Sequence, residues 1–265
     1  MCTLIVYYKL LVDYPIVVAA NRDEYYTRIA RGPHVLHHHP RVYGGKDEKA
    51  GGTWLGTNEY GLVVGLVNRH STLPQDAARR SRGLLCLDLL RQKDAKAAKD
   101  FLVADAAMHQ YNSFYVLWAD DEHAYVAYNE GEITIRDLYP GRYMLTNSSL
   151  IDLAVVTPTG LGDLLTEPPA GAAPDLLLGK LAEACKTHHE IERVVDPPNE
   201  HRGNRALCVH ASEQYGTVSS SLLAIGREFS ASRYFHAEGA PCQTPYRDFS
   251  GLLTGSAEVR NYGYP

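Results

Sequence analysis

The chain has 265 residues, of which 45% are hydrophobic and 22% are charged, the composition of an ordinary globular protein. Its 31 acidic and 26 basic residues give a formal net charge of −5, and the absence of a long basic run argues against nucleic acid as a partner. No apolar stretch approaches the ~20 residues of a membrane span, and the start of the chain lacks the features of a signal peptide. We therefore expect one globular domain over residues 1–265, cytoplasmic and without an integral membrane segment.

The first quarter of the chain predicts a hairpin, a long loop and one further strand. Apolar runs over residues 3–8 and 16–20 predict two buried strands that are joined by a turn near Asp13. Residues 31–53 are rich in Gly, Pro and His and are expected to form a loop. Residues 62–67 predict a strand.

The middle of the chain predicts helices and a run of short strands. Three- and four-residue spacing of apolar residues predicts a helix over residues 81–107 with a break near Lys93 and Asp94, and a second helix over residues 174–189. Short strands are predicted at residues 114–119, 123–128, 132–137 and 142–146.

The last part of the chain predicts a polar loop over residues 192–205 and then a hairpin. This hairpin pairs residues 207–212 with residues 219–225 around a turn at residues 215–217. Strands in runs with helices between them are not the regular βαβ alternation of a Rossmann sheet. The order favours antiparallel sheets with helices packed outside.

The cysteines argue against a disulfide framework and against a metal centre. They are five in number, and no two have C-x-x-C spacing; they are Cys2, Cys86, Cys185, Cys208 and Cys242. We therefore expect a reducing compartment, no structural zinc and no cofactor. The run from His37 to His39 is interpreted as a solvated loop, since three adjacent histidines cannot all face one ion from regular structure.

Cys2 is the first candidate for chemistry. Removal of Met1 gives Cys2 a free α-amine, so one residue then holds both a nucleophile and a base. The α-amine has a reference pKa of ~7.7–8 and the thiol of ~8.5, so both groups titrate near neutral pH. The alternative is that Cys2 is a small buried residue on the first strand.

Blocks of polar residues at the ends of two predicted strands are further candidates. Asn21, Arg22, Asp23 and Glu24 follow the second apolar run, and Asn68 with Arg69 follows the strand at residues 62–67. The alternatives are that Asp23 caps a turn, that Asn68 is a turn residue, and that Arg22 is a buried cation paired with Asp23 or Glu24. On an extended strand Arg22 and Asp23 point to opposite faces.

Several motifs, in order along about 225 of the 265 residues, together resemble the NRDE family, also called the transport and Golgi organisation 2 family. They are Met1-Cys2, Asn21-Arg22-Asp23-Glu24, Gly52-Thr53-Trp54-Leu55-Gly56, Asn58-x-x-Gly61 and Tyr215-Gly216-Thr217. The resemblance implies an α+β fold of the N-terminal-nucleophile (Ntn) hydrolase type. This fold is a four-layer αββα sandwich, with two antiparallel sheets between helices.

A more distant resemblance, to the cholylglycine hydrolase and penicillin V acylase group, implies roles for single residues. Cys2 is then the nucleophile, and Asp23 takes the place of the aspartate that holds the α-amine, so we expect Asp23 to face Cys2. The backbone N–H of Asn68 and the side chain of Asn147, in Leu145-Thr146-Asn147, are then the oxyanion donors. The alternative is that Asn147 is a turn residue.

The sequence departs from that group at two positions. Ala20 stands where the group has an arginine, and Val218 follows Tyr215-Gly216-Thr217 where NRDE relatives often have arginine. Asn21, Arg22 and Glu24 are retained as supporting residues of the site. Trp54 and Arg69 are retained as candidates for substrate binding, with Trp54 as a core residue the alternative.

These observations lead to a hypothesis for function. The chain is expected to hydrolyse the linear C–N amide bond, or the acyl bond, of a small molecule through an acyl-enzyme on Cys2 after Met1 removal. One alternative is a non-catalytic protein on an Ntn-like scaffold that binds and traffics a lipid, an acyl group or haem. A second alternative is an acyltransferase. The oligomeric state is left open.

Overall fold

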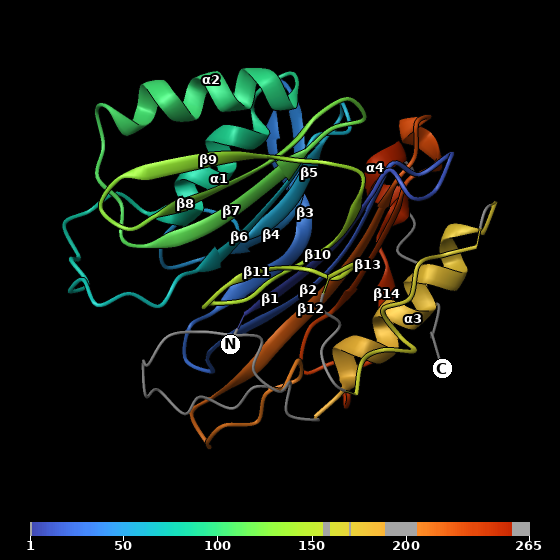
Figure 1. Ribbon diagram of the computed structural model, residues 1–265. Helices are drawn as coiled ribbons and strands as arrows, with labels where there is room; N and C mark the ends of the chain where they lie inside the picture. Colours follow the sequence, from blue (N-terminus) through green and yellow to red (C-terminus); the bar gives the residue numbers. More distant parts are fainter. Residues whose placement is uncertain (1, 156–159, 170, 189–205, 256–265) are drawn as a thin grey trace. The chain divides into compact units, whose positions relative to one another are not determined.

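The computed structural model describes residues 2–155, 160–169, 171–188 and 206–255 (Figure 1). By its internal contacts the chain divides into two compact units, residues 1–27 with 140–265 and residues 28–139. Each unit contains one seven-stranded sheet whose neighbouring strands are all antiparallel. The expectation of a single domain stays a prediction.

The sheet of the first unit has the strand order β11-β10-β1-β2-β12-β13-β14. Its strands are β1 (Thr3–Tyr8), β2 (Ile16–Tyr25), β10 (Gly141–Leu145), β11 (Leu150–Asp152), β12 (Tyr215–Ile225), β13 (Arg233–Ala237) and β14 (Arg247–Asp248). Its helices are α3 (Pro174–Lys186) and the short α4 (Ser250–Thr254). The first two strands and the last ones are far apart in sequence, yet β2 pairs with β12 along its whole length.

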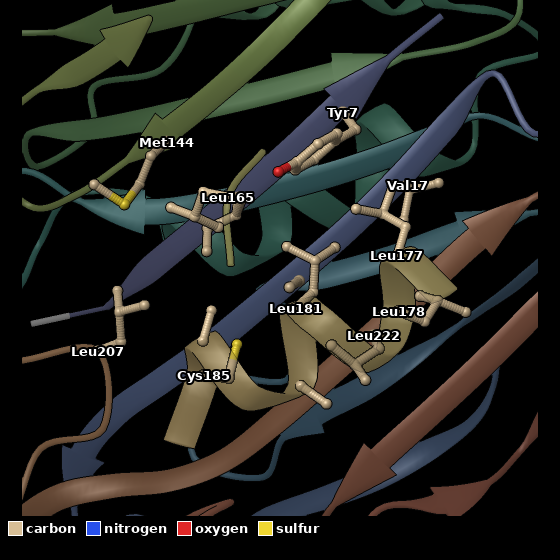
Figure 2. Packing of buried hydrophobic residues seen from close by; sticks show 14 of the residues in the cluster. Tyr7, Val17, Met144, Leu165, Leu177, Leu178, Leu181, Cys185, Leu207 and Leu222 are labelled. Carbon is tan, nitrogen blue, oxygen red and sulfur yellow. The ribbon is translucent and has the colours of Figure 1, made fainter. Parts of the chain in front are cut away.

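The core of this unit lies between α3 and one face of the sheet. Leu177, Leu178 and Leu181 of α3 are buried against the strands that carry Val17 and Leu222 (Figure 2). Burial of each such side chain stabilises the fold by about 1.5–3 kcal/mol. Side chains alternate across a strand, so the contact with α3 decides the face of every residue in β1 and β2.

That alternation has a simple form in the first two strands. Ile5 and Tyr7 of β1, and Val17 and Ala19 of β2, belong to the core under α3. Odd-numbered residues of these strands therefore face α3, and even-numbered residues face the opposite side of the sheet.

The sheet of the second unit has the strand order β3-β4-β5-β6-β7-β8-β9, and α1 and α2 cover one of its faces (Figure 1). Its strands are β3 (Ala30–His38), β4 (Arg41–Asp47), β5 (Leu55–Asn58), β6 (Val63–Asn68), β7 (Phe114–Ala119), β8 (Ala124–Asn129) and β9 (Ile133–Leu138). The helices are α1 (Arg82–Leu90) and α2 (Ala95–Ala106). The predicted break near Asp94 is confirmed: its side chain caps α2 by accepting a 2.6 Å hydrogen bond from the backbone N–H of Ala97.

The predicted loop over residues 31–53 is wrong, because most of it is the hairpin of β3 and β4. Pro33 lies in β3, which is an edge strand with irregular register, and an edge tolerates a residue without an N–H. Gly44 and Gly45 serve packing rather than turns: a Cβ on Gly44 would lie 2.6 Å from the carbonyl oxygen of Leu55. A Cβ on Gly45 would lie 2.5 Å from the ring of Trp54.

Two further strand predictions need correction. The second strand does not end at residue 20 but continues to Tyr25, so Asn21 to Glu24 are part of β2. Residues 215–217 are not a turn but the start of β12, and residues 207–212 contribute only an isolated bridge between His210 and Gly216. Helix α3 ends at Lys186, and the predicted loop over residues 192–205 lies outside the described residues.

The predicted α+β class with two antiparallel sheets is confirmed. In the described part of the chain no helix has the length and apolar character needed to cross a membrane.

His236 gives the first unit a testable pH dependence. Its ring is buried on β13 with Nδ1 2.8 Å from Ser221 Oγ, and burial, then the charge of Arg247, lowers its pKa to about 3. The unfolded chain takes up a proton near pH ~6.5 while the folded chain does not, so stability falls as pH drops from about 6.5 toward 3. We expect His236→Gln to reduce this slope by up to about 1.4 kcal/mol per pH unit.

Denaturant melts across this pH range measure the slope. His123→Gln, which removes an exposed histidine, is the control and should leave the slope unchanged. Identical slopes for His236→Gln and the parent protein would show that His236 is not held neutral.

Candidate functional site

Cys2 lies immediately before β1 and is partly buried. Its Sγ atom is 3.4 Å from both the backbone nitrogen and the backbone oxygen of Asp23, so the main chain of β2 holds the thiol. The position follows from strand pairing, because β1 and β2 form a regular antiparallel ladder that begins at Thr3 opposite Asn21.

The β1–β2 ladder ends at the Thr3–Asn21 pair, and Cys2 and Arg22 are the next residues beyond it on the two strands. Residues opposite each other in an antiparallel pair have their side chains on the same face. Arg22 is buried and follows Ala20 on the face away from α3.

Asp23 is buried where β2 pairs with β12, and the expectation that Asp23 rather than Arg22 faces Cys2 stays a prediction. Its Oδ1 atom accepts a 2.6 Å hydrogen bond from Thr217 Oγ1 of β12, which stands opposite Asp23 in the ladder. Burial raises the pKa of the Asp23 carboxyl, and the hydrogen bond from Thr217 opposes this effect. Tyr215 Oη donates to the backbone oxygen of Asp23 over 3.3 Å.

The motif Tyr215-Gly216-Thr217 thus supports Asp23, a role that sequence reasoning missed. Thr217 Oγ1 also accepts a 2.8 Å hydrogen bond from the backbone N–H of Val209, so its single proton is left for Asp23. A Cβ on Gly216 would lie 2.3 Å from Tyr26 Oη and 2.6 Å from the oxygen of Val209, which explains the glycine. The Tyr215-Gly216-Thr217 motif is visible in the sequence, but the sequence alone does not show that it contacts Asp23.

The thiol of Cys2 is not activated in the chain that begins with Met1. Its pKa is raised to about 11, chiefly by burial and then by the charge of Asp23, while the charge of Arg22 acts in the opposite direction. At neutral pH the sulfur therefore carries its proton, and a nucleophilic role requires another group to accept it.

Asn147 lies at the tip of the hairpin between β10 and β11. Thr146 closes this turn, because its Oγ1 accepts hydrogen bonds of 3.2 and 3.1 Å from the backbone N–H groups of Ser148 and Ser149. Asn147 is buried, and it lies two residues beyond Leu145, whose partner Leu4 lies two residues after Cys2. Asn147 therefore lies just beyond the end of the β10–β1 ladder that is nearer to the start of the chain.

The other two residues of the Asn21 to Glu24 block have local roles. Asn21 Nδ2 donates to the carbonyl oxygens of Cys185 and Leu207 over 2.9 and 2.8 Å, which ties the end of α3 to β2. Glu24 Oε1 accepts a 2.9 Å hydrogen bond from the backbone N–H of Tyr25.

Asn68, Trp54 and Arg69 lie in the second unit. Asn68 is exposed at the end of β6, opposite Phe114. Arg69 Nη2 is 2.7 Å from Glu130 Oε2, and its guanidinium lies over the rings of two tyrosines, so it belongs to a local surface cluster. The ring of Trp54 packs on Gly45, as given above.

The Asn58-x-x-Gly61 motif is structural. Asn58 Nδ2 donates to the carbonyl oxygens of Leu90 and Gln92 over 2.9 and 2.7 Å, while its Oδ1 accepts from the backbone N–H groups of Tyr60 and Leu62. One amide thereby joins the turn after β5 to the end of α1.

Comparison with solved structures identifies the class of fold. The chain matches penicillin V acylase from Agrobacterium tumefaciens with a TM-score of 0.57 and 12% identity, over 95% of this chain and 88% of the acylase. It matches the Caenorhabditis elegans ortholog of N-acylethanolamine-hydrolyzing acid amidase with a TM-score of 0.50 and 14% identity, over 84% of this chain and 92% of the amidase. The chain therefore shares its fold with these Ntn-hydrolase structures, in agreement with the fold class expected from the sequence.

The particular family follows from the sequence comparison. The model of the family "Transport and Golgi organisation 2" matches residues 1–235, and the chain belongs to this family.

Named relatives agree with this assignment. The chain is 28% identical over 237 residues to the mouse transport and Golgi organization 2 homolog, covering 80% of this chain and 82% of the mouse chain. It is 34% identical over 146 residues to the bovine homolog, and this match spans about half of each protein, 52%.

The role of Thr217 can be tested by an isosteric change. Thr217→Val removes the hydroxyl that joins Asp23 to Val209, and hydrogen bonds to charged groups contribute about 1.5–3 kcal/mol. We expect a loss of stability of that size in denaturant melts at pH 7. Ser219→Ala on the same strand is the control, since the buried Ser219 Oγ has no hydrogen-bond partner within the described ranges. A Thr217→Val variant as stable as Ser219→Ala would contradict the role.

Proposed function

We propose that the chain is an Ntn-type cysteine hydrolase that cleaves an amide or acyl bond of a small molecule, with Cys2 as its nucleophile once Met1 is removed. The proposal is carried by the position of Cys2, whose sulfur contacts the backbone of Asp23 where the buried β1–β2 ladder begins. The Ntn fold and the family membership support the same class of chemistry without naming a substrate.

The α-amine of processed Cys2 is the base in this proposal. This amine is a main-chain group next to the start of the β1–β2 ladder, so it is not confined to one face of the sheet. In this proposal the carboxylate of Asp23 therefore reaches the amine from the face opposite the thiol. A carboxylate near the amine raises the affinity of the amine for a proton, which favours proton transfer from sulfur to nitrogen. Thr217 keeps the carboxylate in place.

Arg22 supplies the positive charge that Ala20 cannot. By the alternation of side chains along β2 both residues lie on the face away from α3, and we propose that Arg22 lies opposite Cys2, one residue beyond the last pair of the ladder. A guanidinium beside the sulfur stabilises the thiolate and lowers the pKa of the thiol. Arg22 can therefore take the role of an arginine at position 20 while β2 stays extended.

The reaction then follows the acyl-enzyme route. The thiol gives its proton to the α-amine, and sulfur attacks the carbonyl carbon to form a C–S bond and an oxyanion. The side chain of Asn147 donates to that oxyanion, and the role of the Asn68 backbone N–H stays a prediction. The C–N bond breaks as the ammonium returns its proton to the leaving nitrogen, and water, deprotonated by the amine, cleaves the thioester. An amine or alcohol in place of water would make the same protein an acyltransferase.

One observation favours the non-catalytic alternative, binding and trafficking of a lipid, an acyl group or haem. Ala20 and Val218 stand where arginine is expected from the two family resemblances, and the loss of these cationic groups fits a non-catalytic role. Intact mass of the natural protein separates the two functions, since a retained Met1 places the only α-amine on the wrong residue.

The hydrolase proposal is tested with Asp23→Asn in protein whose Met1 has been removed. We expect iodoacetamide to label Cys2 at least tenfold more slowly at pH 7 than in the parent, because the amine loses the charge that favours its protonation. The stability of the fold should not fall. A carboxyl with a raised folded-state pKa costs stability as pH rises above about 3.9, and the neutral amide removes that cost.

The control is Asp13→Asn, which removes the same charge at the exposed turn of the same hairpin. Peptide mapping of the adducts reports Cys2 separately from the other cysteines. Equal labelling of Cys2 in the Asp23→Asn, Asp13→Asn and parent proteins would refute the role of Asp23, and labelling no faster than that of buried Cys86 would refute Cys2 as nucleophile.

A further inference from the structure

Four side chains with metal-binding atoms that the proposed hydrolase reaction does not use meet in the first unit. They are His188, Cys208, His210 and Cys242, and one ligand atom from each lies within 4.8 Å of the others. They come from three separate segments: the residues after α3, the bridge before β12, and the turn between β13 and β14.

The measured distances fit the edges of a coordination tetrahedron. Cys208 Sγ and Cys242 Sγ are 3.4 Å apart, and His210 Nε2 is 3.2 Å from Cys242 Sγ and 3.9 Å from Cys208 Sγ. Zinc bonds of about 2.3 Å to sulfur and about 2.0–2.1 Å to nitrogen place neighbouring ligand atoms about 3.3–3.8 Å apart. Shifts of a few tenths of an ångström would bring Cys208, His210 and Cys242 to these spacings, and the ligand atom of His188 lies within 4.8 Å of the others.

The fourth residue, His188, is already oriented as a ligand. Its Nδ1 is 3.0 Å from the carbonyl oxygen of Cys208, and because a carbonyl only accepts, Nδ1 carries the proton. This leaves the lone pair on Nε2. Metal-bound histidines usually donate their other ring N–H to a backbone carbonyl or a carboxylate in this way.

We propose that His188, Cys208, His210 and Cys242 hold one zinc ion in a closed Cys₂His₂ site. Two thiolates and two imidazoles in a tetrahedron are the ligand set of structural zinc, and four protein ligands leave no open position for a substrate. Binding releases the two thiol protons, so occupancy falls at low pH.

The site would stabilise a segment on which the hydrolase residues depend. Cys208 and His210 flank Val209, whose N–H binds Thr217 Oγ1, and Thr217 in turn holds Asp23. C-x-x-C spacing does not reveal this cluster, because folding rather than proximity in the sequence brings the four ligands together.

The test is metal analysis of the full chain, expressed without a histidine tag and purified under reducing conditions. We expect about one zinc per chain, and Cys208→Ser or His210→Gln should each lower the content at least fivefold. Cys2→Ala and His39→Gln are the controls for a lost thiol and a lost imidazole outside the cluster, and both should keep the zinc. Cobalt titration of the metal-free parent should give the thiolate charge-transfer and visible bands of a tetrahedral S₂N₂ site.

Two outcomes of these measurements would contradict the zinc proposal. Parent protein that carries no zinc and gives no tetrahedral cobalt spectrum would overturn it, whether or not the variants fold. A Cys208–Cys242 disulfide in protein purified without an added oxidant would also overturn it and would make the pair a redox site.

Discussion

The pairing of β1 with β2 is the constraint on which the proposed site depends. This ladder brings the start of the chain against the end of the second strand, with Thr3 opposite Asn21 and the sulfur of Cys2 on the backbone of Asp23. The core under α3 fixes the faces, because odd-numbered residues are buried there. A slip of one residue would exchange the two faces and would expose that core, so the packing of α3 enforces the register at Cys2.

The register separates the two proton-handling groups of the nucleophile. In the proposed site the thiol shares the face of Arg22, while the carboxyl of Asp23 accepts a hydrogen bond from Thr217 of β12. A terminal α-amine lies in the edge of the sheet and can be reached from either face. The buried Asp23 costs the fold stability at neutral pH, which is expected at a site where function, not stability, determines the residue.

Much of this organisation could be predicted from the sequence, and the errors have physical reasons. The apolar runs and the family motifs predict the Ntn-type fold. The cysteine at position 2 and the aligned motif make Cys2 and Asp23 candidates for the site. The hairpin at residues 31–53 was missed because its glycines and Pro33 meet packing and edge requirements that local propensity cannot express. The face of Arg22 depends on a partner strand, and Thr217 meets Asp23 only across the ladder between β2 and β12, so neither was predictable from neighbours in the sequence.

The most direct test of this account is the pH dependence of Cys2 alkylation in Met1-processed protein with Arg22→Lys and Arg22→Met. Lysine keeps a positive charge opposite the thiol, whereas methionine keeps only the apolar chain. The account predicts that the midpoint of the alkylation profile shifts to higher pH in Arg22→Met than in Arg22→Lys, with both variants folded. The same midpoint in the two variants would contradict the placement of Arg22 beside the Cys2 thiol.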